Sequence, residues 1–299
     1  MRKILITGSA GFSGKYLIKY LLNKKEYDIV GVDKKRSGLI EEKDIDLTKK
    51  EQLSIFLKNY RPDIIFHLAG TTKSNFYKEF YKNNLFTTIN LLERLVENEL
   101  FNTNILLISS AAVYGNPKTN PVKEENSTEP INYYGSSKLA MEKIAMQFFK
   151  NYNLKINIAR TFNIIGTGQP NTFVIPQIIS KLNKLKKNDM KQIIKMGNLD
   201  YRRDYVDIRD VVKAYWEIVE NNIGGIIYNV GSGQSYSVVE IIEKIAKIMK
   251  INVKIKKLVL PKKNGEIKEI VADIRKIKKI GWQPEINIEQ TLKRMVMEK

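Results

Sequence analysis

Short apolar runs, rich in β-branched residues, alternate with amphipathic stretches through the first half of the chain. The runs have the length and composition of buried strands, and the stretches between them repeat apolar residues at the spacing of one helix face. Strands that alternate with helices in this way predict a parallel, doubly wound sheet. The predicted strands are residues 2–7, 28–33, 63–70, 104–110 and 154–160, and the predicted helices are residues 14–24, 50–60, 86–100 and 136–152.

After residue 165 the alternation loosens into turns, short helices and the strand-like segment GIIYNV. This change predicts a smaller region laid against the carboxyl edge of the sheet, with a cleft between the two. We therefore predict an α/β fold with a Rossmann-like doubly wound parallel sheet from residues 1–165, to which a segment at about 204–231 returns. Residues 166–203 and 232–299 are expected to form the smaller C-terminal α/β region.

Composition narrows the class of protein. A chain of 299 residues that is 43% hydrophobic and has 8 prolines can bury a sizeable core. It has no cysteine, which excludes disulfides and cysteine nucleophiles, and its single histidine, His67, cannot build a histidine metal site, so no metal is predicted. The apolar run at the N-terminus is too short for a signal peptide or a membrane span, which predicts a cytoplasmic protein without a membrane partner.

The net charge of +19 raises the question of a nucleic-acid partner. The lysines are scattered along the chain, without an aromatic stacking platform or a nucleic-acid motif, so we interpret them as a solvated surface and predict no nucleic-acid partner. Retention on DNA that falls with salt would argue for the alternative. The same positive field favours an anionic small-molecule substrate.

A glycine-rich turn follows the first predicted strand directly and opens a helix. Gly8, Gly11 and Gly14 let the backbone approach a pyrophosphate, whose charge would lie at the helix N-terminus. Asp33 ends the next predicted strand, where a carboxylate accepts hydrogen bonds from ribose hydroxyls. The spacing therefore predicts a dinucleotide cofactor.

The charges around Asp33 leave that cofactor open between NAD(H) and NADP(H). The carboxylate would repel the additional phosphate of NADP(H), whereas Lys34, Lys35 and Arg36 would attract it. Asp46 is placed to meet the adenine, with a turn residue at a helix N-terminus as its alternative interpretation.

A tyrosine and a lysine, Tyr134 and Lys138, are four residues apart at the start of a predicted helix and so lie on one face. We expect the lysine charge to lower the pKa of the phenol, which would make Tyr134 usable as an acid or base near neutral pH. The preceding strand ends in ISSAAVYG, where Ser110 is a candidate hydrogen-bond donor and Ser109 is interpreted as a polar strand end.

With these motifs the chain resembles the extended short-chain dehydrogenases/reductases, in the branch that acts on nucleotide sugars. The resemblance implies that Ser110 polarises a sugar carbonyl, that Tyr134 transfers the proton, and that Lys138 assists it and contacts the nicotinamide ribose. His67 and Tyr114 would be structural. The resemblance is carried by GSAGFSG, HLAG, NNLFTTINLLE, SSAAVYG, YGSSK, RTFNIIG, RRDYVDIRDVV, YNVGSG and GWQP.

The resemblance also implies the remaining contacts. Residues 1–165 would bind the cofactor, and the smaller region would bind the nucleotide sugar, with Asn163 and Arg203 on the diphosphate and Lys262 or Lys263 in place of an arginine that related enzymes carry. The implied cofactor contacts are Gly8, Gly11, Phe12, Ser13, Gly14, Asp33, Asp46, Leu47, Leu68, Ala69, Gly70, Tyr134 and Lys138. The implied substrate contacts are Asn84, Ser110, Asn163, Phe173, Val174, Arg203, Lys263 and Glu266.

Two alanines after the candidate serine limit the reaction. Related dehydratases carry Asp or Glu where this chain has Ala111 and Ala112, and related enzymes that invert C3 and C5 use a cysteine, which this chain lacks. Reduction of a 4-keto sugar and 4-epimerisation through a transient ketone remain.

The second half of the chain looks most like enzymes that reduce GDP-4-keto-6-deoxy-D-mannose to GDP-D-rhamnose, and this is the predicted function. The segment GEIKEIVAD looks more like a nucleotide-sugar 4-epimerase with tightly bound NAD, which stays the alternative. A non-catalytic nucleotide sensor is a further alternative, against which the intact Ser110, Tyr134 and Lys138 argue. The helices at 85–99 and 136–150 match those through which the family forms dimers, so a homodimer is predicted.

Overall fold

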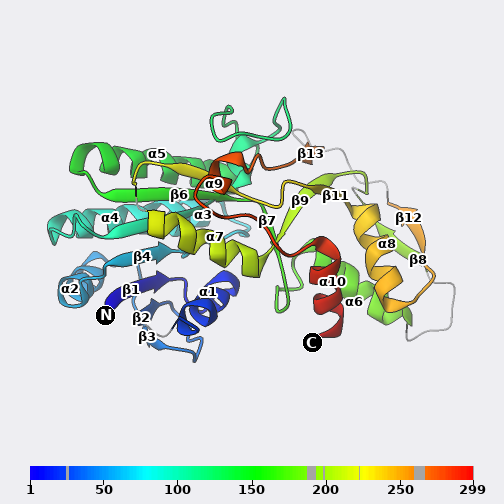
Figure 1. Cartoon of the computed structure of the whole chain (residues 1–299), viewed down its shortest axis with the longest axis horizontal. Helices are drawn as coiled ribbons and strands as arrows, with labels where there is room; N and C mark the ends of the chain where they lie inside the picture. Colours follow the sequence, from blue (N-terminus) through cyan, green and yellow to red (C-terminus); the bar gives the residue numbers. More distant parts are fainter. Residues whose placement is uncertain (25–26, 187–192, 198, 222, 259–266, 299) are drawn as a thin grey trace.

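A parallel sheet of seven strands forms the larger part of the molecule, in the order β10-β6-β5-β4-β1-β2-β3 (Figure 1). The computed structural model describes residues 1–24, 27–186, 193–197, 199–221, 223–258 and 267–298. The strands of the sheet are β1 (Arg2–Thr7), β2 (Tyr27–Val32), β3 (Glu41–Lys43), β4 (Ile64–His67), β5 (Asn104–Ser110), β6 (Lys155–Thr161) and β10 (Ile227–Val230).

Helices cover both faces of this sheet, as the alternating pattern predicts. One hydrophobic core lies under α1 and α7, and a second lies under α2, α4 and α5. Central strands such as β4 are buried on both faces and therefore read as continuous apolar runs. The helices of these layers are α1 (Phe12–Leu22), α2 (Lys50–Tyr60), α3 (Tyr77–Phe80), α4 (Thr87–Glu97), α5 (Tyr133–Tyr152) and α7 (Ile208–Asn221).

Two elements of the large sheet differ from the sequence prediction. Strand β3 has the sequence EEK and was outside the predicted strands, because a short charged strand at a sheet edge has no apolar signature. The helix expected at residues 86–100 is preceded by a π-helix, η1 (Tyr81–Phe86), which hydrophobic periodicity does not reveal.

The smaller region lies beyond the carboxyl ends of the large sheet and has its own core (Figure 1). Strands β7, β9, β11 and β13 form one mixed sheet, and β8 pairs with β12. The fold class predicted from the sequence is thus confirmed, whereas the exact domain boundaries stay predictions. The elements are β7 (Asn163–Ile165), α6 (Val174–Lys186), β8 (Ile193–Met196), β9 (Arg202–Asp207), β11 (Ser235–Ser237), α8 (Val238–Met249), β12 (Lys254–Lys257), β13 (Glu269–Ile270) and α10 (Ile288–Met297). The short helix α9 (Arg275–Lys278) packs against β10 of the large sheet.

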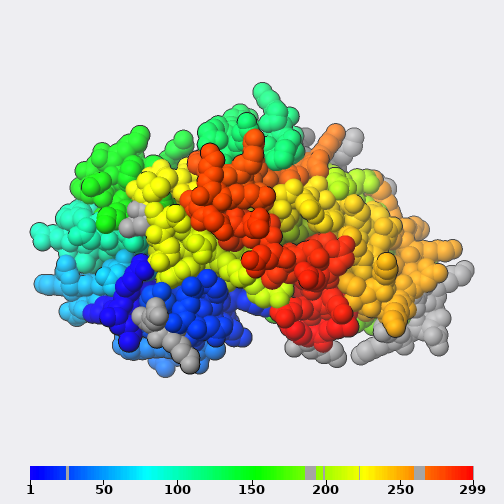
Figure 2. Space-filling view, in the orientation of Figure 1, coloured from blue at the N-terminus to red at the C-terminus, as the bar shows by residue number. Residues whose placement is uncertain are grey.

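Chain segments far apart in the sequence meet where the two regions join. The surface is hollowed between the α1 residues and the C-terminal helix α10 (Figure 2). The Tyr16 hydroxyl of α1 donates a hydrogen bond of 2.8 Å to the Thr167 carbonyl oxygen, which ties the two regions together beside this hollow. Within the described ranges no helix is long and apolar enough to span a bilayer.

Candidate active site

The turn between β1 and α1 has the geometry of a pyrophosphate cradle. Gly8 has a φ of 72°, and a Cβ atom on it would lie 2.8 Å from the Ala69 nitrogen. A Cβ atom on Gly14 would lie 2.6 Å from the Ser9 carbonyl oxygen. Gly11 caps α1 without a side-chain hydrogen bond, and the first turn has no acidic residue. The N–H groups and the positive end of the helix therefore fit an anionic pyrophosphate.

Asp33 is fixed beside this turn, directly after β2. One carboxylate oxygen accepts a hydrogen bond of 3.1 Å from the Ala10 nitrogen, and the other accepts one of 3.0 Å from the Lys35 nitrogen. Each oxygen keeps a lone pair with which it can accept from a ribose hydroxyl. The geometry therefore fits the predicted role.

A cavity of about 240 Å³ runs from the glycine turn along the ends of β2 and β4. It brings together most residues predicted to bind the cofactor, while Phe12, Ser13 and Gly14 lie behind it in the first turn of α1. The predicted residues that line it are Gly8, Gly11, Asp33, Asp46, Leu47, Leu68, Ala69 and Gly70, and further residues, outside the prediction, are Val32, Lys34, Ile45, Asn83 and Thr87.

Lys34 and Asp46 form an ion pair of 3.2 Å in this cavity. Burial acts to raise the pKa of Asp46, but hydrogen bonds from Thr48 and from Lys34 outweigh it and lower that pKa. The pair occupies the ammonium of Lys34, which could otherwise attract a phosphate on the ribose.

Glu42 is a residue of the cofactor region that the sequence did not reveal. Its carboxylate accepts hydrogen bonds from the Ser9 hydroxyl at 2.6 Å and from the Gly38 nitrogen at 3.2 Å. It thereby joins the glycine turn to the loop after Asp33. A lone acidic residue in a charged edge strand has no pattern that would have shown this.

His67 has a structural role, as expected. Its two ring nitrogens are hydrogen-bonded to the hydroxyls of Thr7 at 2.8 Å and Thr88 at 2.9 Å, and the residue is 1% exposed. Burial, together with the charge of Lys138, lowers the pKa of His67 to about 3. A neutral, doubly hydrogen-bonded imidazole is not available as an acid or base near neutral pH.

The predicted catalytic residues meet where β5 ends and α5 begins. Asn132 caps α5 by accepting a hydrogen bond of 2.8 Å from the Gly135 nitrogen, which fixes where the helix starts. Tyr134 is hydrogen-bonded to Ser110, the last residue of β5. The Lys138 ammonium donates to the Ile108 carbonyl oxygen at 2.7 Å.

The pKa values of this pair correct one expectation from the sequence. Burial of the Tyr134 hydroxyl raises the pKa of the phenol, opposed by the hydrogen bond with Ser110, and Lys138 is not among the causes. The expected lowering of the Tyr134 pKa by Lys138 is therefore wrong for this structure, because desolvation disfavours the phenolate. Burial also lowers the pKa of Lys138 to about 8, opposed by the charge of Glu142.

Asn84, predicted to bind substrate, is fully buried in the π-helix η1. Its amide nitrogen donates to the Thr71 carbonyl oxygen at 3.1 Å and to the Ser137 hydroxyl at 2.9 Å, and its oxygen accepts from the Thr71 nitrogen at 2.7 Å. The side chain thus holds the loop after β4 against α5. A contact with substrate stays a prediction.

The other predicted substrate residues lie on the smaller region. Asn163 and Arg203 are on the paired strands β7 and β9; the Asn163 amide donates to the Asp204 carbonyl oxygen at 3.1 Å. Phe173 and Val174 are half-buried at the start of α6. Lys262, Lys263 and Glu266 lie outside the described residues, and their roles stay predictions.

A second cavity, of about 670 Å³, opens in front of Tyr134 between the loop after β4 and the start of α5. Lys73 on that loop donates a hydrogen bond to the Thr172 carbonyl oxygen and lies 4.9 Å from the centre of the Phe173 ring. Lys73 therefore reaches from the large sheet to α6 beside the candidate catalytic tyrosine. No sequence pattern indicated Lys73, because it lies in a loop without periodicity.

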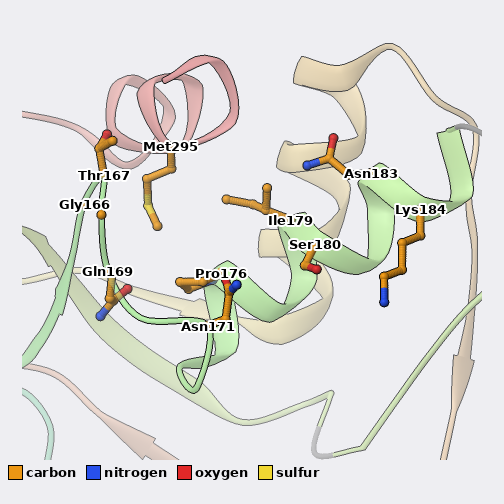
Figure 3. Close-up of a pocket in the computed structure, with 11 residues that line it drawn as sticks. Gly166, Thr167, Gln169, Asn171, Pro176, Ile179, Ser180, Asn183, Lys184 and Met295 are labelled. Carbon is orange, nitrogen blue, oxygen red and sulfur yellow. The ribbon is translucent and has the colours of Figure 1, made fainter. Parts of the chain in front are cut away.

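A third cavity, of about 450 Å³, is lined by residues of α6, of α10 and of the loop after β7 (Figure 3). Ile179 of α6 and Met295 of α10 point into it, and Gln169 comes from the loop after β7 (Figure 3). The buried Oε1 atom of Gln169 has no hydrogen-bond partner among the described residues. None of the predicted substrate residues that the structure describes lines this cavity.

A half-buried tyrosine and a buried lysine near a strand-end serine and a pyrophosphate cradle are features expected of the NAD-dependent epimerases/dehydratases, an extended branch of the short-chain dehydrogenases/reductases. Residues 5–295 match the family described as GDP-mannose 4,6 dehydratase, and the chain belongs to this family. It is thus an enzyme of the class that acts on nucleotide sugars.

Relatives with assigned names cover nearly the whole chain. GDP-6-deoxy-D-talose 4-dehydrogenase of Aggregatibacter actinomycetemcomitans is 31% identical over 92% of this chain and 90% of that protein. GDP-6-deoxy-D-mannose reductase of Pseudomonas aeruginosa is 30% identical over 98% of this chain and 95% of that protein. The structure of RMD from Pseudomonas aeruginosa complexed with NADPH has a TM-score of 0.88 and 29% identity, and covers 99% of this chain and 98% of that one.

The predicted cofactor class, NAD(H) or NADP(H), agrees with these structures. RMD was solved with NADPH, and UDP-glucose 4-epimerase of Thermus thermophilus, which shares the fold at 23% identity and a TM-score of 0.85, was solved with NAD. NADP(H) differs from NAD(H) by an additional phosphate on a ribose. In the predicted arrangement, Asp33 and Lys34 lie next to that ribose.

Proposed function

We propose that this protein is a nucleotide-sugar 4-ketoreductase that reduces GDP-4-keto-6-deoxy-D-mannose to GDP-D-rhamnose, with NADH or NADPH as reductant. The observation that carries the proposal is geometric: the Tyr134 phenol, whose pKa is raised by burial, is hydrogen-bonded to Ser110 at the end of β5, and Ala111 and Ala112 follow that serine. Reduction of a ketone needs such a proton donor, whereas oxidation of an alcohol, the first step of an epimerase, needs a base.

The names of the relatives support the substrate class. Both GDP-6-deoxy-D-talose 4-dehydrogenase and GDP-6-deoxy-D-mannose reductase are named for GDP-linked 6-deoxyhexoses. These two sugars differ only in configuration at C4, the carbon whose oxidation state would change. The proposal therefore specifies both the reduction at C4 and the mannose configuration of the product. The assay described below measures both.

Each catalytic side chain has a defined task in this reaction. When bound, the nicotinamide cofactor supplies the hydride for C4. The Tyr134 hydroxyl donates its proton to the ketone oxygen, so that one hydride and one proton convert the carbonyl to a secondary alcohol. The Ser110 hydroxyl donates a hydrogen bond to the same oxygen as its charge develops, and the Lys138 ammonium stabilises the tyrosinate that remains.

The family name does not imply dehydration here. Elimination of water needs an acid and a base beyond the tyrosine, and the dehydratases that this chain resembles place carboxylates directly after the serine. This chain has Ala111 and Ala112 at these positions, in the short 3₁₀-helix η2 (Ala111–Tyr114). Methyl groups transfer no protons, which favours a reductase over a dehydratase.

A 4-epimerase with tightly bound NAD⁺ is the second candidate. UDP-glucose 4-epimerases of Halalkalibacterium halodurans and Lactobacillus helveticus are 26% and 28% identical to this chain over 97% and 94% of its length. An epimerase would need Tyr134 to accept a proton from the substrate hydroxyl at the start of its cycle.

The test is a turnover assay with the purified protein. GDP-4-keto-6-deoxymannose, generated by a dehydratase, is added with NADH or NADPH, and the loss of reduced nicotinamide is followed beside the product's NMR spectrum. The proposal predicts stoichiometric oxidation and GDP-D-rhamnose. The C4 epimer as product would overturn the stereochemical assignment, and an absence of oxidation with NAD⁺ released on denaturation would favour the epimerase.

We also expect a homodimer that buries the outer faces of α4 and α5. These helices pack against each other on one face of the sheet, and large side chains at their ends, Phe86 and Tyr152, are 54% and 47% exposed. Light scattering after size exclusion measures the mass, and a monomer would contradict this expectation.

A further inference from the structure

Helix α5 presents three polar side chains at successive turns of one face: Tyr134, Lys138 and Glu142. The first two belong to the proposed reaction. Glu142 lies one turn further from the cleft, is 2% exposed, and has no task in that reaction. Three consecutive residues at the end of β5 bind these side chains: Ser110 is hydrogen-bonded to Tyr134, Ile108 accepts from Lys138 through its carbonyl oxygen, and Ser109 donates through its hydroxyl to Glu142.

A second strand holds Glu142 from the other side. Arg160 of β6, 4% exposed, donates to both carboxylate oxygens, through Nη2 at 2.7 Å and through Nε at 3.1 Å. Its remaining nitrogen donates to the Tyr114 hydroxyl at 3.0 Å and to the Glu124 carbonyl oxygen at 2.8 Å. A buried pair with this many hydrogen bonds keeps both charges in place. Removing one partner would leave the other charge uncompensated.

We propose that Glu142 is a positioning residue for the catalytic pair: through Ser109 and Arg160 it fixes the rotation of α5 on the sheet, and it holds a negative charge one helical turn from the Lys138 ammonium. The inference rests on the proposed function only in that Tyr134 and Lys138 carry the reaction. It corrects the interpretation of Ser109 as a mere polar strand end.

The surroundings of Lys138 show why a charge at Glu142 matters. Burial lowers the pKa of Lys138 to about 8, and Glu142 acts in the opposite direction. From β4, His67 faces the lysine as a neutral ring, because its own pKa is lowered to about 3. On β6, the Arg160 guanidinium is paired with the Glu142 carboxylate itself, and on α5 the pKa of Tyr134 is raised by burial. Without the carboxylate, burial alone would release the lysine proton at a lower pH.

The test measures the titration of Lys138 directly, without a substrate. The folded protein is acetylated with trace acetic anhydride between about pH 6 and pH 11, a range that includes the lowered pKa of Lys138 and the ordinary pKa of lysine, and the extent at Lys138 is read by peptide mass spectrometry relative to a surface lysine. The wild type should give a midpoint near pH 8, in line with the lowered pKa. Glu142→Gln should move that midpoint down by about one pH unit, and Glu142→Asp should restore most of it.

Two further variants separate charge from structure. Glu289→Gln removes an exposed carboxylate that pairs with Lys244 at the start of α10, and should leave the Lys138 midpoint unchanged. Ser109→Ala keeps the Glu142 charge but removes one hydrogen bond that holds α5, so it should keep the midpoint while kcat falls about threefold to tenfold at constant KM.

The proposal has distinct ways to fail. A Glu142→Gln protein with native circular dichroism and an unchanged Lys138 midpoint would overturn the electrostatic part. A Ser109→Ala enzyme with wild-type kcat would overturn the positioning part, and this holds even if Glu142→Gln does not fold. The acetylation readout needs no turnover, so an absence of ketoreductase activity would count against the proposed function and not against this inference.

Discussion

The edge where β5 meets α5 and the cleft in front of α6 differ in how their side chains are held. At the edge, Lys138 and Ser109 are at most 6% exposed, and each is hydrogen-bonded to a neighbouring element. In the cleft, Asn163 and Lys73 are exposed on a short strand and a loop. Packing thus fixes the groups around the candidate proton donor, whereas the groups that would choose the substrate lie on surface segments. The chemistry is therefore predictable from a motif, and the sugar is not.

The largest effect is expected from removing the proton donor at the buried edge. Tyr134→Phe should lower kcat by about 1,000-fold, because a positioned acid contributes on that order, while NADH binding is retained. Steady-state kinetics and NADH fluorescence titration measure the two quantities. Near wild-type turnover would break the assignment of Tyr134, and joint loss of binding and unfolding temperature would show a structural defect instead.

The glycine turn should show the next largest effect. Gly14→Ala places a Cβ atom 2.6 Å from the Ser9 carbonyl oxygen and must shift the turn that would hold the pyrophosphate. We expect cofactor affinity to fall about 30-fold, the equivalent of about 2 kcal/mol in misplaced hydrogen bonds. Gly38→Ala is a matched control, because open space surrounds that glycine, although its positive φ adds local strain. Equal cofactor affinities for wild type and Gly14→Ala would contradict the role of this turn in binding the pyrophosphate.

A substitution in the cleft should change binding rather than chemistry. Arg203→Lys keeps the charge but loses the planar fork that would engage two phosphate oxygens, so KM for the nucleotide sugar should rise about tenfold at constant kcat. Initial-rate kinetics with saturating NADPH check this. A fall in kcat without a change in KM would place Arg203 in the chemical step and erase the contrast between the two regions.

The pH dependence of the rate reports on the buried edge alone. The reaction needs Lys138 in its charged form, which is complete well below its pKa of about 8 and is lost as the pH rises through that value. We therefore expect kcat to be level near neutral pH and to halve near pH 8, at the pKa of Lys138. Lys138→Arg, which stays charged, should remove that alkaline limb while lowering the rate. A rate that rises with pH would show instead that ionised Tyr134 is the active form.

The smallest effect is expected at Lys73. Because this side chain is exposed and bonded to the Thr172 carbonyl oxygen, Lys73→Met should change KM by only about threefold, in keeping with the small worth of exposed polar contacts. Thermal unfolding should be unchanged. A hundredfold rise in KM would show that Lys73 contributes to substrate binding as strongly as a buried residue does. It would identify the cavity in front of Tyr134 as a substrate site.

The sequence predicted the large sheet well because its strands are buried on both faces and its motifs fall at strand ends. Ser110, Tyr134 and Lys138 meet as expected, since helix spacing and strand order alone determine their positions. The partners of Glu42 and Glu142 could not be predicted, because single acidic residues carry no period and their partners are distant in sequence. The prediction of a lowered Tyr134 pKa was wrong because a sequence motif indicates which charges lie near the phenol, but not how far the phenol is shielded from water.

The central claim is that the enzyme transfers hydride from external NADH or NADPH to C4 while Tyr134 supplies the proton. The most direct measurement uses a reduced cofactor that carries deuterium at the transferred position, with mass spectrometry and NMR of the GDP-sugar product. The account predicts one deuterium at C4 of GDP-D-rhamnose and stoichiometric formation of oxidised cofactor. Absence of deuterium transfer, from protein that retains NAD⁺ through purification and interconverts a saturated nucleotide sugar with its C4 epimer without added cofactor, would contradict it and indicate an epimerase.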